Sequence, residues 1–476
     1  MLQNFIIDRI KAELPFEPNE EKAGLMDALG AFIVSRAPRK AFILRGYAGT
    51  GKTSVMAALV RALKKLNQPC ILLAPTGRAA KVLSRYSGEP AFTIHKKIYR
   101  QNQLGADAFS LSDNLHRNTL FIVDEASMLS GNRDNPTFGS GCLLDDLVRY
   151  VYNDHGCSLL LLGDDAQLPP VGSTISPALD ADYMAGYQLT ITNYQLTAVA
   201  RQSLESGILS EATRLRKQLS TLHSPLDDFS QLSTLHSQLH PNGTDILRLK
   251  GEEVVETLEN SWRDVGAEET LIIARSNKMT NLYNAGVRAR VLYKEDDLSN
   301  SDRIMVTKNN YFWTQEYDDL DFLANGDMFE IERITNRHEL YGFQFAKASL
   351  RSVDYSYEID ALIWIDTLMT DSPEANYSLQ RELFSRIAED YPEIKNRKEL
   401  VKRIFESPYY NALQVRFAYC VTCHKAQGGQ WKHVYIDTSG IGEDEARMAD
   451  PVERKEYLRW IYTAVTRATE KIYLLR

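Results

Sequence analysis

The first third of the chain repeats one pattern of hydrophobic and polar positions: a short apolar run, a polar loop, and a segment with apolar residues at helical spacing. Short apolar runs bounded by turn residues fit strands that are buried on both faces. They occupy residues 41–46, 71–75, 119–123 and 158–163. The segment after the first run has one apolar face, made by Val55, Leu59, Leu63 and Leu66. Alternating strands and helices predict a parallel sheet covered by helices on both faces.

The same pattern returns in the second half of the chain. A strand-like run near residue 270 precedes a helix-like segment at 281–291, and further apolar runs stand at 433–437 and 471–476. Between about 301 and 415 the pattern changes, and IMVTKNNYFW, MFEIERI and YSYEIDALIWI look like strands of a small barrel. We therefore predict two α/β lobes, the second of which is interrupted by a β-rich insertion.

Composition narrows the class of protein. Of 476 residues, 55 are Lys or Arg and 63 are Asp or Glu, so the formal net charge is −8, which excludes a basic coat protein or an arginine-rich tail binder. The 44% hydrophobic and 25% charged residues are typical of a globular chain. At about 100 to 200 residues per domain, the length allows roughly two to four domains.

Cysteine use and hydropathy indicate the compartment. Five scattered cysteines fit a reducing cytosol, and the CxxC pair Cys420 and Cys423 lacks the second pair that a zinc site needs. The chain has no run of 18 apolar residues, and its N-terminus lacks the pattern of a signal peptide. We expect a cytoplasmic protein without a membrane anchor.

Residues 46–53 match the phosphate-binding loop, Gly-x-x-x-x-Gly-Lys-Thr, between a predicted strand and a predicted helix. Its glycines let backbone N–H groups turn inward around a phosphate, and the start of the helix adds its positive end. Lys52 would reach the β- and γ-phosphates, and Thr53 would bind Mg²⁺. A chance glycine-rich turn is the alternative, which the two flanking elements disfavour.

Polar residues follow the next two strands. Asp124 and Glu125 come after the run at 119–123, where Asp124 would hold Mg²⁺ and Glu125 would deprotonate the attacking water. Gln167 follows the run at 158–163 and would contact both the γ-phosphate and that water. The alternatives are a helix cap for the acids and a plain surface turn for Gln167.

Eight segments in order along the chain resemble the motifs of superfamily 1B helicases of the RecD/Dda group, which are related to Pif-type helicases. The segments are GYAGTGKTS (46–54), LLAPTGRAAKVLS (72–84), TIH (93–95), LFIVDEASML (120–129), GDDAQLPPVG (163–172), YQLTAVARQS (194–203), VTCHKAQGGQW (421–431) and YTAVTRA (462–468). Each short motif is weakly specific by itself, whereas the ordered set spans nearly the whole chain.

The resemblance implies an α/β fold with two RecA-like lobes that have parallel sheets. The first lobe would span 1–190 and contain a short β-hairpin, the pin, at about 100–118. The second would combine 191–300 with 416–476, and residues 301–415 would form an inserted SH3-like β-barrel.

The resemblance also implies ATP and Mg²⁺ as cofactors. ATP contacts would come from Gly46, Ala48, Gly49, Thr50, Gly51, Lys52, Thr53 and Ser54. Relatives read adenine with a glutamine whose position corresponds to Glu20 here, so the preference between ATP and GTP stays open. Arg201 and Arg467 would be arginine fingers, since rigid guanidinium forks suit the charge on a γ-phosphoryl group in transition.

The DNA track of such a helicase crosses both lobes. By resemblance, its residues are Pro75, Thr76, Arg78, His95, Lys308, Asn309, Thr422, His424 and Lys425. A local cationic groove is sufficient for binding single strands, so the net charge of −8 is compatible with it. For His95 and His424, the alternative is a buried, hydrogen-bonded histidine. Phe109 would stack on the terminal base pair at the pin, or else pack the base of the hairpin.

These expectations describe an ATP-dependent DNA helicase that moves 5′ to 3′ on single-stranded DNA and acts at junctions between single and double strands. Other replication, repair or recombination proteins could be partners. Three alternatives remain: the motor subunit of a helicase–nuclease complex, a P-loop ATPase that binds nucleic acid without unwinding it, and an enzyme that acts on RNA.

Overall fold

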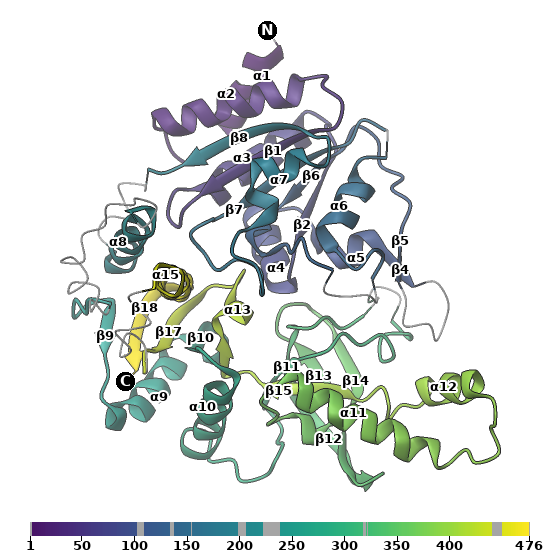
Figure 1. Cartoon of the computed structure of the whole chain (residues 1–476). Coiled ribbons are helices and arrows are strands. Elements are labelled where there is room, and N and C mark those ends of the chain that lie inside the picture. The colour runs from purple at the N-terminus through teal and green to yellow at the C-terminus, as the bar shows by residue number, and fades with distance from the viewer. Residues whose placement is uncertain are drawn as a thin grey trace.

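The computed structural model describes residues 2–101, 109–133, 138–153, 155–198, 206–221, 239–317, 320, 322–439 and 450–475. Within these residues, two α/β lobes face each other and a barrel lies beside the second lobe, below the first (Figure 1). Both lobes contain parallel sheets, so the predicted fold class is confirmed.

The first lobe is built on a six-stranded parallel sheet with the order β3-β2-β6-β7-β1-β8. The strands are β1 (Lys40–Gly46), β2 (Cys70–Ala74), β3 (Ala91–Thr93), β6 (Leu120–Val123), β7 (Ser158–Gly163) and β8 (Thr190–Leu196). In β1, Ala41 and Ile43 enter one hydrophobic core, and Phe42 and Leu44 enter another. The predicted runs are continuously apolar because both faces of the sheet are buried.

Helices cover both faces of this sheet. One face is covered by α1 (Leu2–Ala12), α2 (Glu20–Val34), α3 (Lys52–Lys65) and α4 (Gly77–Ser87), and the other by α5 (Ile94–Ile98), α6 (Leu143–Val151) and α7 (Ala181–Ala185). Short 3₁₀ turns are η1 (Ala126–Met128) and η2 (Pro177–Leu179).

The first lobe extends beyond residue 190, where its end was predicted. The edge strand β8 pairs in parallel with β1, with Ile43 opposite Asn193, so the first sheet includes residues through Leu196. The sequence of β8, TITNYQL, is polar because an edge strand is only partly buried, and it therefore lacks the apolar run that marks the other strands.

The second lobe has a five-stranded parallel sheet with the order β16-β10-β17-β18-β9. Its strands are β9 (Ile246–Arg248), β10 (Thr270–Ala274), β16 (Cys420–Thr422), β17 (Trp431–Asp437) and β18 (Ala468–Leu475). Its helices are α8 (Gly207–Thr221), α9 (Val254–Val265), α10 (Asn277–Arg290), α13 (Cys423–Ala426) and α15 (Pro451–Val465), with turns η5 (Gly251–Glu253) and η6 (Ala267–Glu269). Helices α8 and α15 pack on one face, and α9 and α10 on the other.

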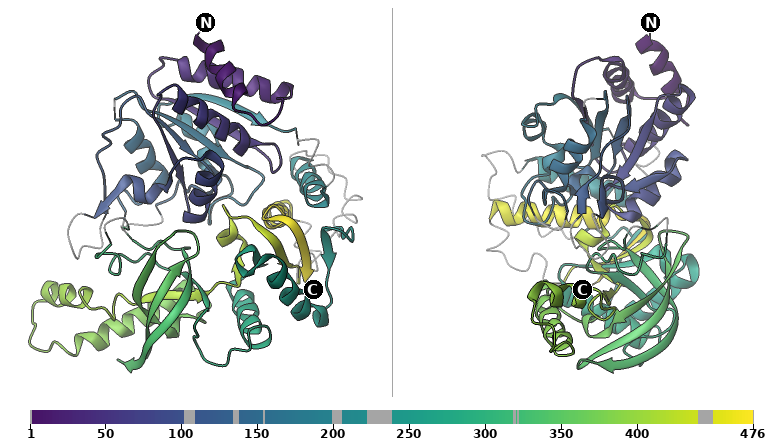
Figure 2. Two further views of the ribbon diagram at one scale, coloured as in Figure 1. Left: turned by 180° about the vertical axis from the view of Figure 1, so that it is seen from behind. Right: turned by 90° about the vertical axis from the view of Figure 1, so that its right-hand side faces the viewer.

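The insertion in the second lobe is a closed barrel of five strands, as predicted. They are β11 (Arg303–Val306), β12 (Met328–Leu340), β13 (Phe343–Ser352), β14 (Glu358–Trp364) and β15 (Leu413–Phe417). After β14 come the turn η7 (Ile365–Thr367) and two helices, α11 (Pro373–Ala388) and α12 (Arg397–Phe405). These helices form an arm that projects from the barrel away from the second lobe (Figure 2), and the sequence analysis did not predict them.

A small hairpin joins the first lobe to the barrel. Strands β4 (Tyr99–Gln101) and β5 (Phe109–Leu111) pair antiparallel within the predicted pin segment. The tip, residues 102–108, lies outside the described residues. Among the helices of the described ranges, none combines the length and apolar character needed to cross a membrane.

Candidate nucleotide site and nucleic-acid cleft

The P-loop connects β1 to α3. Gly49 and Gly51 have φ values of 76° and 86°, a backbone region that side chains with a Cβ rarely adopt. Helix α3 begins after Gly51 without a side-chain cap, so its first N–H groups are available to an anion. Lys52 Nζ donates hydrogen bonds to the carbonyl oxygens of Gly46 and Tyr47, which holds the ammonium inside the loop.

Two carboxylates stand at the carboxyl end of β6. Glu125 has a φ of 52°, a strained conformation for a non-glycine residue, and its N–H donates to Asp124 Oδ1 at 2.9 Å. Burial raises the pKa of both carboxyls. The charge of Lys52 opposes this shift at both residues, and that of Arg467 opposes it at Glu125. The two acids therefore lie close to the P-loop cation.

Magnesium ligands are present at the same place. Thr53 follows Lys52 in the first turn of α3, and Asp124 is close enough to Lys52 for its pKa to respond to that charge. Hydroxyl and carboxylate oxygens are the donors that Mg²⁺ prefers. These two residues thus fit the predicted metal role.

Gln167 and Asp164 follow β7 on the same edge of the sheet. Gln167 is 5% exposed, and its Oε1 has no hydrogen-bond partner in the described residues. A buried amide oxygen of this kind needs a hydrogen-bond donor from a ligand or water. Asp164 Oδ2 accepts a hydrogen bond from Tyr462 Oη at 2.6 Å, and burial raises the pKa of Asp164 to about 6.

The second lobe contacts this site through Tyr462 in α15 and through Arg467, which follows the helix. Tyr462 Oη accepts a hydrogen bond from the N–H of Ala48 in the P-loop at 3.0 Å. Arg467 is 3% exposed, is held by the carbonyl oxygens of Thr463 and Gly429 at 3.1 Å, and affects the pKa of Glu125. The sequence analysis missed Tyr462, although it stands in the same short motif as Arg467.

Two residues that were predicted to contact the nucleotide, Arg201 and Glu20, are not placed at the P-loop by the described structure. Arg201 lies outside the described residues. Glu20 is the exposed first residue of α2, and its contact with the adenine stays a prediction. The nearby Lys22 is 4% exposed and lies against Gly51 instead.

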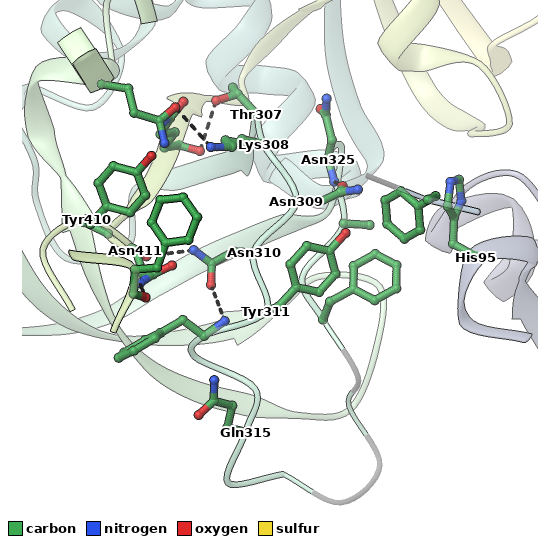
Figure 3. Close-up of a pocket in the computed structure, with 18 of the residues that line it drawn as sticks. His95, Thr307, Lys308, Asn309, Asn310, Tyr311, Gln315, Asn325, Tyr410 and Asn411 are labelled. Carbon is green, nitrogen blue, oxygen red and sulfur yellow. Dashed lines mark hydrogen bonds between the residues drawn. The ribbon is translucent and has the colours of Figure 1, made fainter. Parts of the chain in front are cut away.

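A second cavity, of about 500 Å³, lies where the first lobe, the barrel and α13 meet. Five predicted DNA-binding residues line it: Pro75, His95, Lys308, Asn309 and Lys425. Figure 3 shows His95 facing the barrel loop that carries Lys308, Asn309 and Asn310. The cavity therefore brings together residues that are up to 350 positions apart in the chain.

The chemistry of this cavity suits a nucleic acid strand. Lys308 and Lys425 supply positive charge, and aromatic side chains that can stack on bases include Tyr311 and Tyr410 (Figure 3). Lys425 Nζ donates to Asn325 Oδ1 at 2.6 Å. Burial lowers the pKa of His95 to about 4, so this histidine is neutral near pH 7. The sequence analysis did not single out Tyr311, Tyr410 or Asn325, which lack a motif of their own.

Two protein-family models match the chain in the two lobes. A model described as an AAA domain matches residues 28–223, and a UvrD-like helicase C-terminal domain matches residues 417–475. The first match contains the P-loop and the acidic residues of β6, and the second contains Lys425 and Arg467.

Three curated relatives are similar to this chain. An uncharacterized protein of Acanthamoeba polyphaga mimivirus is 22% identical over 92% of this chain and 96% of its own length. The ATP-dependent RecD2 DNA helicase of Deinococcus radiodurans is 25% identical over 62% of this chain and 37% of its own. The ATP-dependent DNA helicase dda of Enterobacteria phage T4 is 26% identical over 58% of both chains. The matched region is thus less than two thirds of either named helicase.

The chain is similar to superfamily 1B helicases of the RecD/Dda group. In this chain, the paired motifs of the two lobes meet at the P-loop, because Ala48 of the first lobe contacts Tyr462 of the second.

Arg78, a predicted DNA-binding residue, has protein partners from the second lobe and the barrel. Its guanidinium lies 4.0 Å from the ring centroid of Trp431, Nη2 donates to the carbonyl oxygen of Gln430 at 2.9 Å, and Nη1 lies 3.9 Å from Asp354 Oδ1. Arg78 therefore connects the first lobe to the second lobe and to the barrel. Its predicted contact with DNA stays a prediction.

Phe109 is 5% exposed and packs inside an aromatic cluster. Its ring centroid lies 4.1 Å from that of Tyr311 in the barrel and 5.0 Å from that of Phe138 in the first lobe. A ring in this position cannot meet an incoming base pair. The contacts favour the alternative role, packing at the base of the hairpin.

Three other predicted residues do not line the cavity. Thr76 Oγ1 accepts from the N–H of Ala79 and caps α4. Thr422 precedes α13, and His424 is half-buried, with its pKa lowered by burial. Their DNA contacts stay predictions.

Proposed function

We propose that this helicase hydrolyses ATP in the cleft between its lobes and uses the energy to move along single-stranded DNA and separate duplex DNA. The observation that carries the proposal is the meeting of Glu125 and Arg467, which come from different lobes and lie close enough for their charges to interact. Hydrolysis that needs both lobes can be coupled to their relative movement.

Each residue has a defined part in the proposed reaction. The P-loop N–H groups and Lys52 bind the phosphates, and Mg²⁺ held by Thr53 and Asp124 supplies charge neutralisation. Glu125 takes a proton from the attacking water, while Gln167 orients that water. Arg467 stabilises the charge that develops on the γ-phosphoryl oxygens. With the γ-phosphate gone, the attraction between Arg467 and the bound nucleotide weakens and the cleft opens.

The proposed DNA path uses the cavity between the first lobe, the barrel and α13. A DNA strand in this cavity would contact Pro75 and His95 of the first lobe. It would also contact Lys308 and Asn309 of the barrel and Lys425 of α13. Closure of the two lobes moves the first set relative to Lys425, which would pull the strand. By its family, the movement is 5′ to 3′, and the proposed substrates are single strands and junctions.

A strand-displacement assay tests this function. Duplexes with a 5′ tail, a 3′ tail or a fork are incubated with the protein, ATP and Mg²⁺, in DNA and RNA versions. We expect displacement of the strand on 5′-tailed and forked DNA, and none on 3′-tailed DNA. ATP hydrolysis stimulated by single strands, without displacement of any duplex, would instead support a translocating ATPase.

The proposed cellular setting is the cytoplasm, alongside replication, repair or recombination proteins. The alternative of a motor subunit in a helicase–nuclease complex is tested by purifying the tagged protein from its native host. A nuclease that copurifies stoichiometrically would support that alternative.

A further inference from the structure

Lys22 is a buried cation beside the P-loop for which the described residues supply no acceptor. It stands in the first turn of α2 and is 4% exposed. A Cβ atom placed on Gly51 would lie 3.1 Å from its Cε and 3.7 Å from its Nζ. Among the described residues, the one electrostatic contact of this ammonium is a cation–π contact with Phe16. Its Nζ lies 5.2 Å from the centroid of that ring. The described residues give this ammonium no acceptor, and it keeps a narrow contact with solvent, so it is available to a ligand that carries acceptors.

The position of α2 indicates whether Lys22 lies near the phosphates or near the base of a bound nucleotide. Strand β1, which leads into the P-loop, lies between β7 and β8. The groups that act on the γ-phosphate follow β6 and β7, on one side of β1. The start of α2 lies on the opposite side, because Glu21 accepts hydrogen bonds from the N–H groups of Thr197 and Ala198 just after β8, at 2.7 and 2.9 Å. The nucleoside end of a bound triphosphate therefore leaves the loop toward α2.

We propose that Lys22 reads the base of the bound nucleotide and that it favours guanine over adenine. The inference rests on the proposed function, since it concerns the nucleotide that drives the same motor. Phe16 supports a base in this position. It is 39% exposed beside the ammonium, and a flat ring offers a stacking surface to a base but nothing to a phosphate.

The preference for guanine over adenine follows from the hydrogen-bond donors and acceptors of lysine and of the two bases. A lysine ammonium has three donors and no acceptor. Guanine presents two acceptors on one edge, O6 and N7, whereas adenine presents N7 beside the N6 amino group, which is itself a donor. An ammonium facing adenine can satisfy N7 but meets the N6 donor with another donor. Glutamine has both a donor and an acceptor and matches adenine on both atoms.

The first experiment compares nucleotides with the unmodified protein. Hydrolysis stimulated by single-stranded DNA is measured with ATP, GTP and 7-deaza-GTP, which lacks the N7 acceptor. We expect kcat/KM for GTP to equal or exceed that for ATP, and kcat/KM for 7-deaza-GTP to fall about 5-fold or more below that for GTP. An ATP preference of tenfold or more over GTP would overturn the proposal.

The second experiment changes Lys22. K22Q should raise the ratio of kcat/KM for ATP to that for GTP by about 5- to 100-fold, the range for one good pair of base contacts. K22M should abolish the penalty for 7-deaza-GTP. The matched control is D27N, at an exposed position on the same helix α2, which should leave all ratios unchanged. Thermal unfolding of each variant confirms that it is folded.

Two outcomes separate this inference from its rivals. If Lys22 holds a phosphate, K22M will weaken inhibition by tripolyphosphate and reduce affinity for ATP and GTP equally, which would refute base reading. If the protein hydrolyses no nucleotide with DNA, the proposed function fails. Equilibrium binding of GTP and ATP to the protein and to K22Q then still tests the inference, and an unchanged ratio of the two affinities in K22Q refutes it.

Discussion

Lys52 and Glu125 meet the nucleotide at different stages of the reaction. Lys52 is held at the P-loop carbonyls, where it contacts phosphates in the ground state, whereas Glu125 acts on water. K52A should therefore weaken nucleotide binding, and E125Q should keep binding but lower hydrolysis by about 10² to 10⁴. Binding of a fluorescent nucleotide and single-turnover hydrolysis are the measurements, with D27N, at an exposed position on α2, as the control. Normal hydrolysis by E125Q would refute the assignment.

Arg467 is expected to act on the transition state. A rigid guanidinium fork suits the equatorial oxygens of the transferred group, and arginine fingers contribute about 10³ to 10⁵ in rate. R467A should lose turnover stimulated by DNA with little change in nucleotide affinity, and R467K should keep the charge but recover little activity. Because Arg467 also bonds Gly429 and Thr463, unfolding temperatures are measured in parallel. A large loss of affinity with unchanged turnover would indicate a ground-state role.

At the scale of elements, the aromatic cluster at the hairpin connects the first lobe to the barrel. Phe109 contributes from β5, Phe138 from the loop before α6, and Tyr311 from the barrel loop after β11. F109A leaves a cavity there and should destabilise the fold by about 3 to 5 kcal/mol. Unwinding and ATP hydrolysis stimulated by single strands should then fall together.

The matched control for this prediction is F92A, because Phe92 is a 37% exposed ring on the edge strand β3. Its removal should change stability by much less. Calorimetric unfolding and the two activity assays give the comparison. Loss of unwinding alone in F109A, with normal stability, would restore the role of this ring as a wedge.

At the scale of the whole molecule, the nucleic-acid cavity is formed where the first lobe, the barrel and α13 of the second lobe meet. Lys425 on α13 is exposed to solvent, and it lines the cavity, where protein atoms replace part of its water. This desolvation, with the nearby charge of Arg416, lowers its pKa to about 8. A phosphate binds the charged form, so affinity for single-stranded DNA should fall as pH rises above 8, where binding must first take up a proton.

The measurement is fluorescence anisotropy of a labelled single strand from pH 7 to 9 at constant ionic strength, since salt alone changes such affinities. K425R should keep its charge and bind almost equally at both ends of this range. K425M should bind more weakly and lose this part of the pH dependence. The same fall in affinity above pH 8 in K425M would show that another group titrates.

Much of the fold could be predicted from the sequence because its determinants are local. Ala41, Phe42, Ile43 and Leu44 are all apolar because alternate residues enter different cores, and that is visible as a continuous run. The P-loop is equally readable, since its backbone turn, its cation and its helix start are consecutive residues. Strand β8 and helices α11 and α12 were missed, because an edge strand and a projecting arm bury too little to leave a clear pattern.

The roles of Arg78, Phe109 and Lys22 were decided by tertiary structure alone. The sequence by itself determined which nucleotide chemistry the chain carries and the order of its motifs. It did not determine that Arg78 would meet Gln430, 352 positions away, or that Phe109 would meet Tyr311. A guanidinium, a ring and an ammonium are each suited to several partners. Which partner they take depends on what the fold brings within a few ångströms, because contacts of this kind act only at short range.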